Sequence, residues 1–219
     1  MDDYFFFRFL LYALAPQPLT AEFVFEQWQN KSWGLHDVEY TREEIRIDLA
    51  SDASSRFRRR RRLYHHYFFL HRADDHEYIE SSALQRAYSI NHGTRSVLWE
   101  FRLGGGQWPP KVPQDKKCHS ATQEIGAQVR FAGETRVGRY SAIRYLAKAN
   151  SEIVEFLFSP DLNCGLVGYS AYEPNSIGLP VKVERLRLQR VELREPDAQP
   201  FMPPADYSSR WVDSLHCGN

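Results

Sequence analysis

Apolar and polar residues alternate with a period of two along most of this chain. In residues 154–164 (VEFLFSPDLNC), valine or phenylalanine occupies every second position until a Ser-Pro-Asp turn. In residues 94–103, the alternating apolar side chains include Val97, Trp99 and Phe101. Successive side chains of a strand point to opposite faces of a sheet, so this period predicts strands that bury one face.

The same pattern predicts further strands, several of them rich in charge. They are expected at residues 22–28, 38–48, 57–71, 135–149, 164–173 and 181–193. Residues 77–90 begin as a strand and then take the spacing of a short helix near residues 83–88. Hairpin turns are expected at residues 72–76 (RADDH) and 132–134 (AGE), where small and acidic residues tolerate turn conformations.

These strands recur every 10–15 residues, roughly, which leaves no room for crossover helices. The pattern therefore predicts a mainly β fold, a single curved antiparallel sheet with few helices; a β-sandwich is the alternative. The apolar residues of 181–193 switch parity twice, which is typical of a strand with bulges or a strong bend. One domain is expected over residues 22–207, with a long loop at 104–117 and a tail at 208–219.

Composition supports a β-rich protein with a sizeable core. The chain has 219 residues, and 14% of them are aromatic, a class of residue that strands favour. Lys plus Arg and Asp plus Glu both number 28, so the formal net charge is zero. No overall field attracts a polyanion, and no nucleic-acid partner is expected.

Five consecutive arginines, Arg58–Arg62, are the strongest local charge feature. Because alternate residues of a strand face opposite sides, the five cannot form one patch. Arg58, Arg60 and Arg62 share a parity and are the candidates for contact with an anionic surface. The alternative is a solvated strand whose arginine stems cover neighbouring apolar surface.

No catalytic or metal-binding motif is evident. The histidines at 65, 66, 71 and 76 lack the spacing of a zinc site. The triple glycine at 104–106 lacks the frame of a phosphate-binding loop, and no serine lies in a nucleophile elbow. We therefore expect no enzyme, no metal and no cofactor.

The first 21 residues allow two interpretations. Their apolar run is shorter than the roughly 20 residues of a membrane span, and Ala13-Leu14-Ala15 has the small-x-small form of a cleavage site. Two early aspartates and Arg8 are unusual in a leader. The segment is therefore either a degenerate signal peptide or an N-terminal segment that remains in the protein.

Several stretches in the second half resemble uncharacterised bacterial envelope proteins. They are GETRVGRYSAIR (133–144), EFLFSPDLNC (155–164), VERLRLQRVELREPD (183–197) and PFMPPADY (200–207). The layout is similar to that of the periplasmic lipoprotein-carrier (LolA/LolB-like) superfamily, although Phe156 stands where a tryptophan is expected and Asn163 where a glycine is expected. The resemblance implies a half-open antiparallel barrel around an apolar cavity.

The three cysteines, Cys118, Cys164 and Cys217, allow by count either one bridge with a spare thiol or three unrelated thiols. The resemblance implies a Cys118–Cys164 disulfide in an oxidising compartment. In the chain-entropy model, closing a loop of that length contributes about 4 kcal/mol.

The resemblance and the aromatic strands together lead to a functional hypothesis. The protein is expected to be a non-enzymatic, periplasmic or otherwise extracytoplasmic monomer that binds a lipid or a lipoprotein acyl chain. Trp99, Phe101, Phe156 and Phe158 are the candidate ligand-binding residues. The alternative is a structural or interaction module that contacts an anionic surface, including a membrane periphery, through the Arg58–Arg62 strand.

Overall fold

The computed structural model describes residues 18–30, 38–52, 54–65, 69–102, 118, 129–149, 152–174, 180–196 and 201–209. Within them, twelve strands form one sheet in the order β12-β6-β5-β4-β3-β2-β1-β11-β10-β9-β8-β7. The strands are β1 (Leu19–Asn30), β2 (Val38–Leu49), β3 (Ser55–His65), β4 (Phe69–Ser81), β5 (Arg86–Asn91), β6 (Ser96–Arg102), β7 (Val129–Val137), β8 (Tyr140–Ala149), β9 (Glu152–Ser159), β10 (Gly165–Pro174), β11 (Pro180–Glu192) and β12 (Ser208–Ser209).

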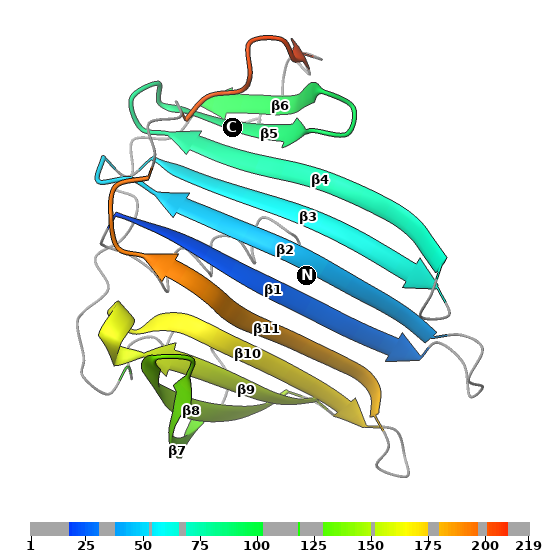
Figure 1. Cartoon of the computed structure of the whole chain (residues 1–219), viewed down its shortest axis with the longest axis vertical. Coiled ribbons are helices and arrows are strands. Elements are labelled where there is room, and N and C mark those ends of the chain that lie inside the picture. Colours follow the sequence, from blue (N-terminus) through cyan, green and yellow to red (C-terminus); the bar gives the residue numbers. More distant parts are fainter. Residues whose placement is uncertain are drawn as a thin grey trace, which may run out of the picture.

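Two antiparallel meanders make up this sheet. Strands β1 to β6 form the first and strands β7 to β11 the second, and the antiparallel pairing of β1 with β11 joins them. The sheet runs from β6 at one end to β7 at the other, without closing into a barrel (Figure 1). The predicted mainly β fold with a single antiparallel sheet is confirmed, and the alternative of two packed sheets is wrong for the residues described.

One face of the sheet, called here the core face, carries a continuous apolar cluster. Alternation places Ala21 and Phe23 on this face of β1, and both are at most 1% exposed. Their register partners continue the cluster into Ile45 and Ile47 of β2 on one side and Leu188 of β11 on the other. The cluster extends from Phe57 on β3 to Tyr145 and Ala147 on β8. Such burial of a shared face is the main favourable contribution to the stability of a sheet.

The opposite face, called here the outer face, carries a second, smaller cluster at β4 to β6. It consists of Ile79, Tyr88, Ile90 and Val97. Phe201 and Tyr207 pack against it from residues 201–209, called here the strap, which ends in β12 and pairs in parallel with β6. The first two residues of the tail predicted at 208–219 form β12, and the others lie outside the described residues.

Two of the predicted turns are wrong. Residues 72–76 lie inside β4, because Asp74 and Asp75 stand opposite Arg61 and Arg60 of β3, and charge pairing holds these acidic residues in a strand. Residues 132–134 lie inside β7 at a bulge, where Gly133 adopts a φ of 111° that suits glycine. The helix considered near residues 83–88 is also absent, since a turn there connects β4 to β5.

The Ser-Pro-Asp turn forms as expected. A single 3₁₀ turn at Pro160–Leu162 joins β9 to β10, and the backbone N–H of Asn163 donates to the carbonyl of Pro160 at 3.2 Å. Asn163 has a φ of 57°, in the left-handed region. Asparagine tolerates this region better than other non-glycine residues, which explains how it stands where the resembling family has glycine.

Some sequence predictions lie outside the described residues. These are residues 1–17 of the predicted leader, the loop at 104–117, and Cys217. In the part of the chain that is described, no helix has the length and hydropathy needed to cross a membrane.

The core face makes a direct prediction for stability. Phe158 is 0% exposed, so Phe158→Ala is expected to lower the free energy of unfolding by about 3–5 kcal/mol through lost burial and a cavity. Phe131 is 58% exposed, so Phe131→Ala is expected to change it by less than about 0.5 kcal/mol. Urea unfolding followed by circular dichroism measures both, and equal losses would contradict this placement.

Candidate functional site

The four predicted ligand-binding aromatics do not form one site. Phe156 and Phe158 lie on the core face of β9 and are 7% and 0% exposed. Trp99 and Phe101 lie in β6, and seven strands separate β6 from β9 in the sheet (Figure 1). The structure therefore places the two pairs in different parts of the sheet, and the β9 pair belongs to the large core cluster.

Phe156 and Phe158 belong to an aromatic group that spans β8 to β10. Phe156 stacks on Phe158 with ring centroids 6.2 Å apart, and it lies 5.6 Å from the ring of Tyr169. Tyr145 meets Phe158 edge to face at 6.2 Å. Offset and edge-to-face contacts of this kind stabilise aromatic clusters beyond their buried area. Sequence analysis did not select Tyr145 and Tyr169, because only strand register shows that they share a face with Phe156.

A polar group lies beside these aromatics on the same face. The hydroxyl of Tyr169 donates to Glu184 Oε2 at 3.1 Å, and Gln27 Nε2 donates to Glu184 Oε1 at 3.2 Å. Lys182 Nζ lies 2.8 Å from Glu184 and 3.6 Å from Glu152. Glu184 therefore accepts from three side chains on β1, β10 and β11.

This polar group shifts two pKa values. Burial of the Tyr169 phenol, reinforced by the neighbouring Glu184 carboxylate, raises the pKa of Tyr169 well above its usual range. Burial alone would lower the pKa of Lys182, but the hydrogen bond and charge of Glu184 outweigh it and the pKa rises. Tyr169 is thus neutral and Lys182 charged at neutral pH, so the group presents hydroxyl, ammonium and carboxylate next to an aromatic surface.

The predicted Cys118–Cys164 disulfide is present in the structure. The two Cα atoms are 5.2 Å apart, and the cysteines are separated by 46 positions in the sequence. Cys118 is 0% exposed and belongs to the same cluster as Phe158. The bridge therefore fixes residue 118 against the apolar core face.

Two cavities are lined by residues that the structure describes. One of about 460 Å³ is at the β7–β8 hairpin, lined by residues that include Glu134, Ile143 and Pro160. The other, of about 130 Å³, is lined by polar and charged side chains of the outer face. In the aromatic group, the side chains of Phe156, Phe158 and Tyr145 are buried.

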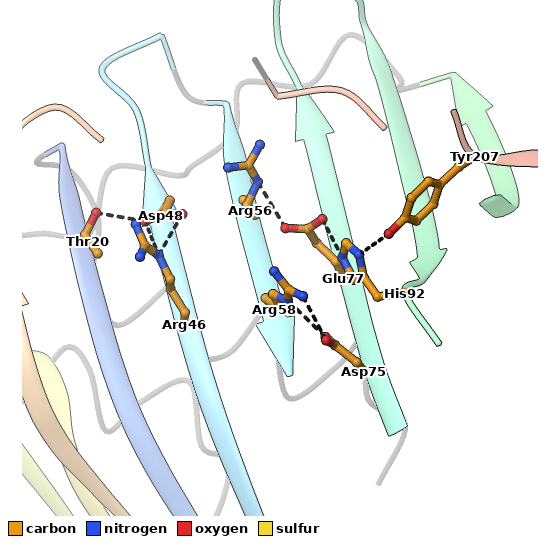
Figure 2. Close-up of polar contacts among 9 residues, drawn as sticks. All are labelled: Thr20, Arg46, Asp48, Arg56, Arg58, Asp75, Glu77, His92 and Tyr207. Atoms are coloured by element: carbon orange, nitrogen blue, oxygen red, sulfur yellow. Dashed lines mark hydrogen bonds and ion pairs between the residues drawn. The ribbon is translucent and has the colours of Figure 1, made fainter. Parts of the chain in front are cut away.

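On the outer face, the predicted alternation of the arginine run is confirmed, and acids accompany it. The guanidinium of Arg58 donates two hydrogen bonds to Asp75, at 2.9 and 2.8 Å (Figure 2). Arg60 lies 3.4 Å from the same carboxylate. Arg62 is exposed on this face. Arg59 and Arg61 lie on the core face, where Arg61 pairs with Glu43 at 3.4 Å. Arg58 and Arg60 are thus partly neutralised within the fold.

A buried polar chain connects β3 to the strap. Arg56 Nε lies 3.1 Å from Glu77, the other carboxylate oxygen of Glu77 lies 3.0 Å from His92 Nε2, and His92 Nδ1 lies 2.8 Å from the Tyr207 hydroxyl (Figure 2). The Arg56, Glu77 and His92 side chains are 12%, 8% and 13% exposed. These contacts, together with the apolar packing of Phe201 and Tyr207, hold the strap over β4 to β6.

The described residues contain no group of three or more His, Cys, Asp or Glu side chains placed to hold a metal ion. The polar chain from Arg56 to Tyr207 pairs charged and polar side chains with one another, and it has the character of a structural network.

Comparisons with known proteins give likenesses of fold. No protein-family model matches the chain, and no curated protein matches it. Similar solved structures include a beta-barrel-like protein of the domain of unknown function DUF1849 from Brucella abortus, with 9% identity, a TM-score of 0.41, and coverage of 84% of this chain and 100% of that chain. LprF from Mycobacterium bovis has 7% identity and a TM-score of 0.37, with coverage of 86% of this chain and 96% of that chain. A LolA superfamily protein from Nitrosomonas europaea has 9% identity and a TM-score of 0.25, covering 85% and 91%.

The disulfide gives a second prediction. Replacing both cysteines (Cys118→Ser with Cys164→Ser) is expected to lower the free energy of unfolding by about 2–4 kcal/mol, because the unfolded chain regains the freedom that the bridge removes. Urea unfolding of the oxidised protein and of the double variant measures the loss. Reductant should destabilise the wild type and leave the double variant unchanged; a reductant effect on both would contradict the assignment.

The Arg58–Asp75 pair gives a pH prediction. Burial alone would raise the pKa of Asp75, but hydrogen bonds and charge from Arg58 outweigh it and hold the pKa below its usual 3.8. A carboxyl with a lowered folded-state pKa stabilises the fold above its unfolded pKa, and this contribution disappears as pH falls through the folded value. Asp75→Asn should therefore be less stable than wild type at pH 7, and the difference should shrink below pH 3.8. Thermal unfolding across pH measures it, and a difference that stays constant would contradict this role.

Proposed function

We propose that this protein is a non-enzymatic extracytoplasmic protein of the bacterial envelope that binds a lipid or other amphiphile against the core face of its open sheet. The observation that carries the proposal is the continuous apolar core face itself. It extends across β8, β9, β10, β11, β1, β2 and β3 and belongs to a sheet that does not close on itself in the described residues. An open sheet of this kind offers an apolar surface that a long acyl chain can follow.

The polar group around Glu184 supports an amphiphilic ligand over a purely apolar one. Tyr169 belongs to both environments, with its ring 5.6 Å from Phe156 and its hydroxyl bonded to Glu184. Lys182 adds a positive charge beside the same carboxylate. A ligand with its chain on the aromatic group and its head near Lys182 would satisfy both parts of this surface.

Access to the aromatic group requires movement, because its side chains are buried in the structure. Residue 118 packs in the cluster and is tied to Cys164 at the start of β10. The disulfide thus limits how far the contacts at this end of the core face can open. A disulfide bond also agrees with an oxidising compartment outside the cytoplasm.

The test of this proposal is lipid occupancy. Native mass spectrometry of protein purified from a bacterial host is expected to show copurified lipid, and a fluorescent acyl probe is expected to bind after delipidation. Phe156→Ala should weaken probe binding about tenfold, because it removes an aromatic contact from the centre of the surface.

Leu84→Ala is the control, since Leu84 is 45% exposed and lies in the turn between β4 and β5, outside the core cluster. It should leave probe binding unchanged. A wild-type protein that carries no lipid and ignores the probe after delipidation, or a probe affinity that both variants reduce equally, would overturn the proposal.

A further inference from the structure

A row of aromatic and aliphatic side chains crosses the outer face near the ends of six strands. Its members, each opposite the next in strand register, are Tyr64, Tyr40, Trp28, Val183, Tyr172 and Ile153. We call this set the aromatic row. Six neighbouring strands at their usual spacing extend roughly 24 Å, so the row is long compared with an isolated surface aromatic.

The aromatic row is accessible and ordered by its own contacts. Trp28 lies 5.2 Å from Tyr40, and Tyr40 stacks on Tyr64 at 5.8 Å, measured between ring centroids. Ile153 is exposed, and the other members are half-buried. By contrast, the outer-face cluster at β4 to β6 is covered by the strap. A contiguous exposed apolar surface on a sheet is typical of a place where another surface docks.

Positive charge is concentrated around this row. The row and the two neighbouring rows of the outer face on β1 to β3 and β8 to β11 carry seven cations and three carboxylates, in a chain whose total charge is zero. The cations are Arg42, Arg60, Arg62, Arg144, Lys148, Arg185 and Arg187, and the carboxylates are Glu26, Glu44 and Glu155. All seven cations are exposed, and Arg60 also lies 3.4 Å from Asp75 of the neighbouring strand β4.

Two of the three carboxylates are partly buried and occupied. Glu26, whose side chain is 18% exposed, accepts from the Tyr40 hydroxyl at 2.9 Å and lies 3.4 Å from Arg187 and 3.9 Å from Arg42. Glu155 lies 3.8 Å from Arg144. Their charges are therefore directed at the neighbouring arginines and are shielded from solvent.

One pair of arginines with like charges stands opposite in register beside the aromatic row. Arg42 of β2 stands directly opposite Arg62 of β3, and like charges opposite one another destabilise a sheet. An external anion between them relieves this repulsion. Arg62 is also the one member of the sequence-predicted set at positions 58, 60 and 62 that lies beside the aromatic row.

We propose that the aromatic row and its flanking arginines form a docking surface for a bilayer that contains anionic phospholipid. Tyrosine and tryptophan favour the boundary between head groups and acyl chains, because each combines an apolar ring with a polar atom. Arginines beside them meet the lipid phosphates, with which a guanidinium forms two parallel hydrogen bonds. This surface is separate from the core face, so its role does not depend on ligand binding there.

Vesicle sedimentation with the full-length protein tests the surface. Wild type is expected to cosediment with phosphatidylcholine vesicles that contain about one third phosphatidylglycerol, more weakly with pure phosphatidylcholine, and less at high salt. Reversing two exposed arginines beside the row, Arg62→Glu with Arg185→Glu, should reduce the partition coefficient on the anionic vesicles at least tenfold, roughly, since each basic residue near such a surface contributes to binding.

Arg136→Glu with Arg139→Glu is the matched control. Both arginines are exposed at the β7–β8 hairpin, which joins the opposite end of β8 from Lys148, and the control changes the net charge by the same amount. It should retain wild-type partitioning.

Tyr172→Ser tests the aromatic row itself. It should weaken binding to anionic vesicles while leaving the salt dependence of that binding intact, because it removes an apolar contact and no charge.

Circular dichroism and thermal unfolding of each variant confirm that it is folded. Loss of binding in the Arg62/Arg185 variant with retention in the Arg136/Arg139 control supports the proposal. The proposal is overturned if the wild type does not bind anionic vesicles, which is the result expected of a surface that docks an acidic protein. It is also overturned if both charge variants bind the vesicles equally. The apolar residues 5–14 are present in every variant, so they cannot produce a difference between them.

Discussion

The antiparallel pairing of β1 with β11 is the contact on which the remaining architecture depends. It joins two meanders that are each local in sequence, and it brings Phe23 and Phe25 opposite Leu188 and Leu186. Without it, the core face would divide into two narrower apolar surfaces, each with an additional unpaired edge. The bulge beside Phe23 lets the two halves keep their apolar sides aligned across the seam, since a shift of one residue would otherwise turn every later side chain to the opposite face.

The two faces of this sheet are stabilised by different interactions. On the core face, aromatic packing and a polar group around Glu184 lie next to one another, and the apolar side chains are buried. On the outer face, cross-strand ion pairs such as Arg58–Asp75 stabilise charged strands, and the strap covers the one buried apolar cluster. Because side chains alternate, changes to one face leave the other largely unaffected, so a ligand surface and a docking surface can coexist on the same strands.

The periodicity of two was sufficient to predict the fold class and most strands, including the β9 alternation of Val154, Phe156 and Phe158. It could not predict which strands lie side by side. Trp99 resembles Phe156 in its local pattern, but strand order separates them, and that order follows from a long-range pairing. The acidic residues at 74 and 75 have the local pattern of a turn, because the arginines that hold them in a strand lie on β3 and are identified only by strand register. The aromatic row cannot be predicted from the sequence for the same reason. It contains a single side chain from each strand, and only the strand register shows that these side chains are neighbours.

The position of the disulfide within the chain has a consequence for the order of assembly. Cys118 and Cys164 both precede β11, whereas β1 cannot complete its second edge until β11 has been made. In a chain that emerges from its N-terminus, the bridge can close the segment that contains β7, β8 and β9 while β1 still awaits pairing with β11. Oxidation at this stage reduces the conformational freedom of β7 to β9 before β11 pairs with β1 and completes the sheet.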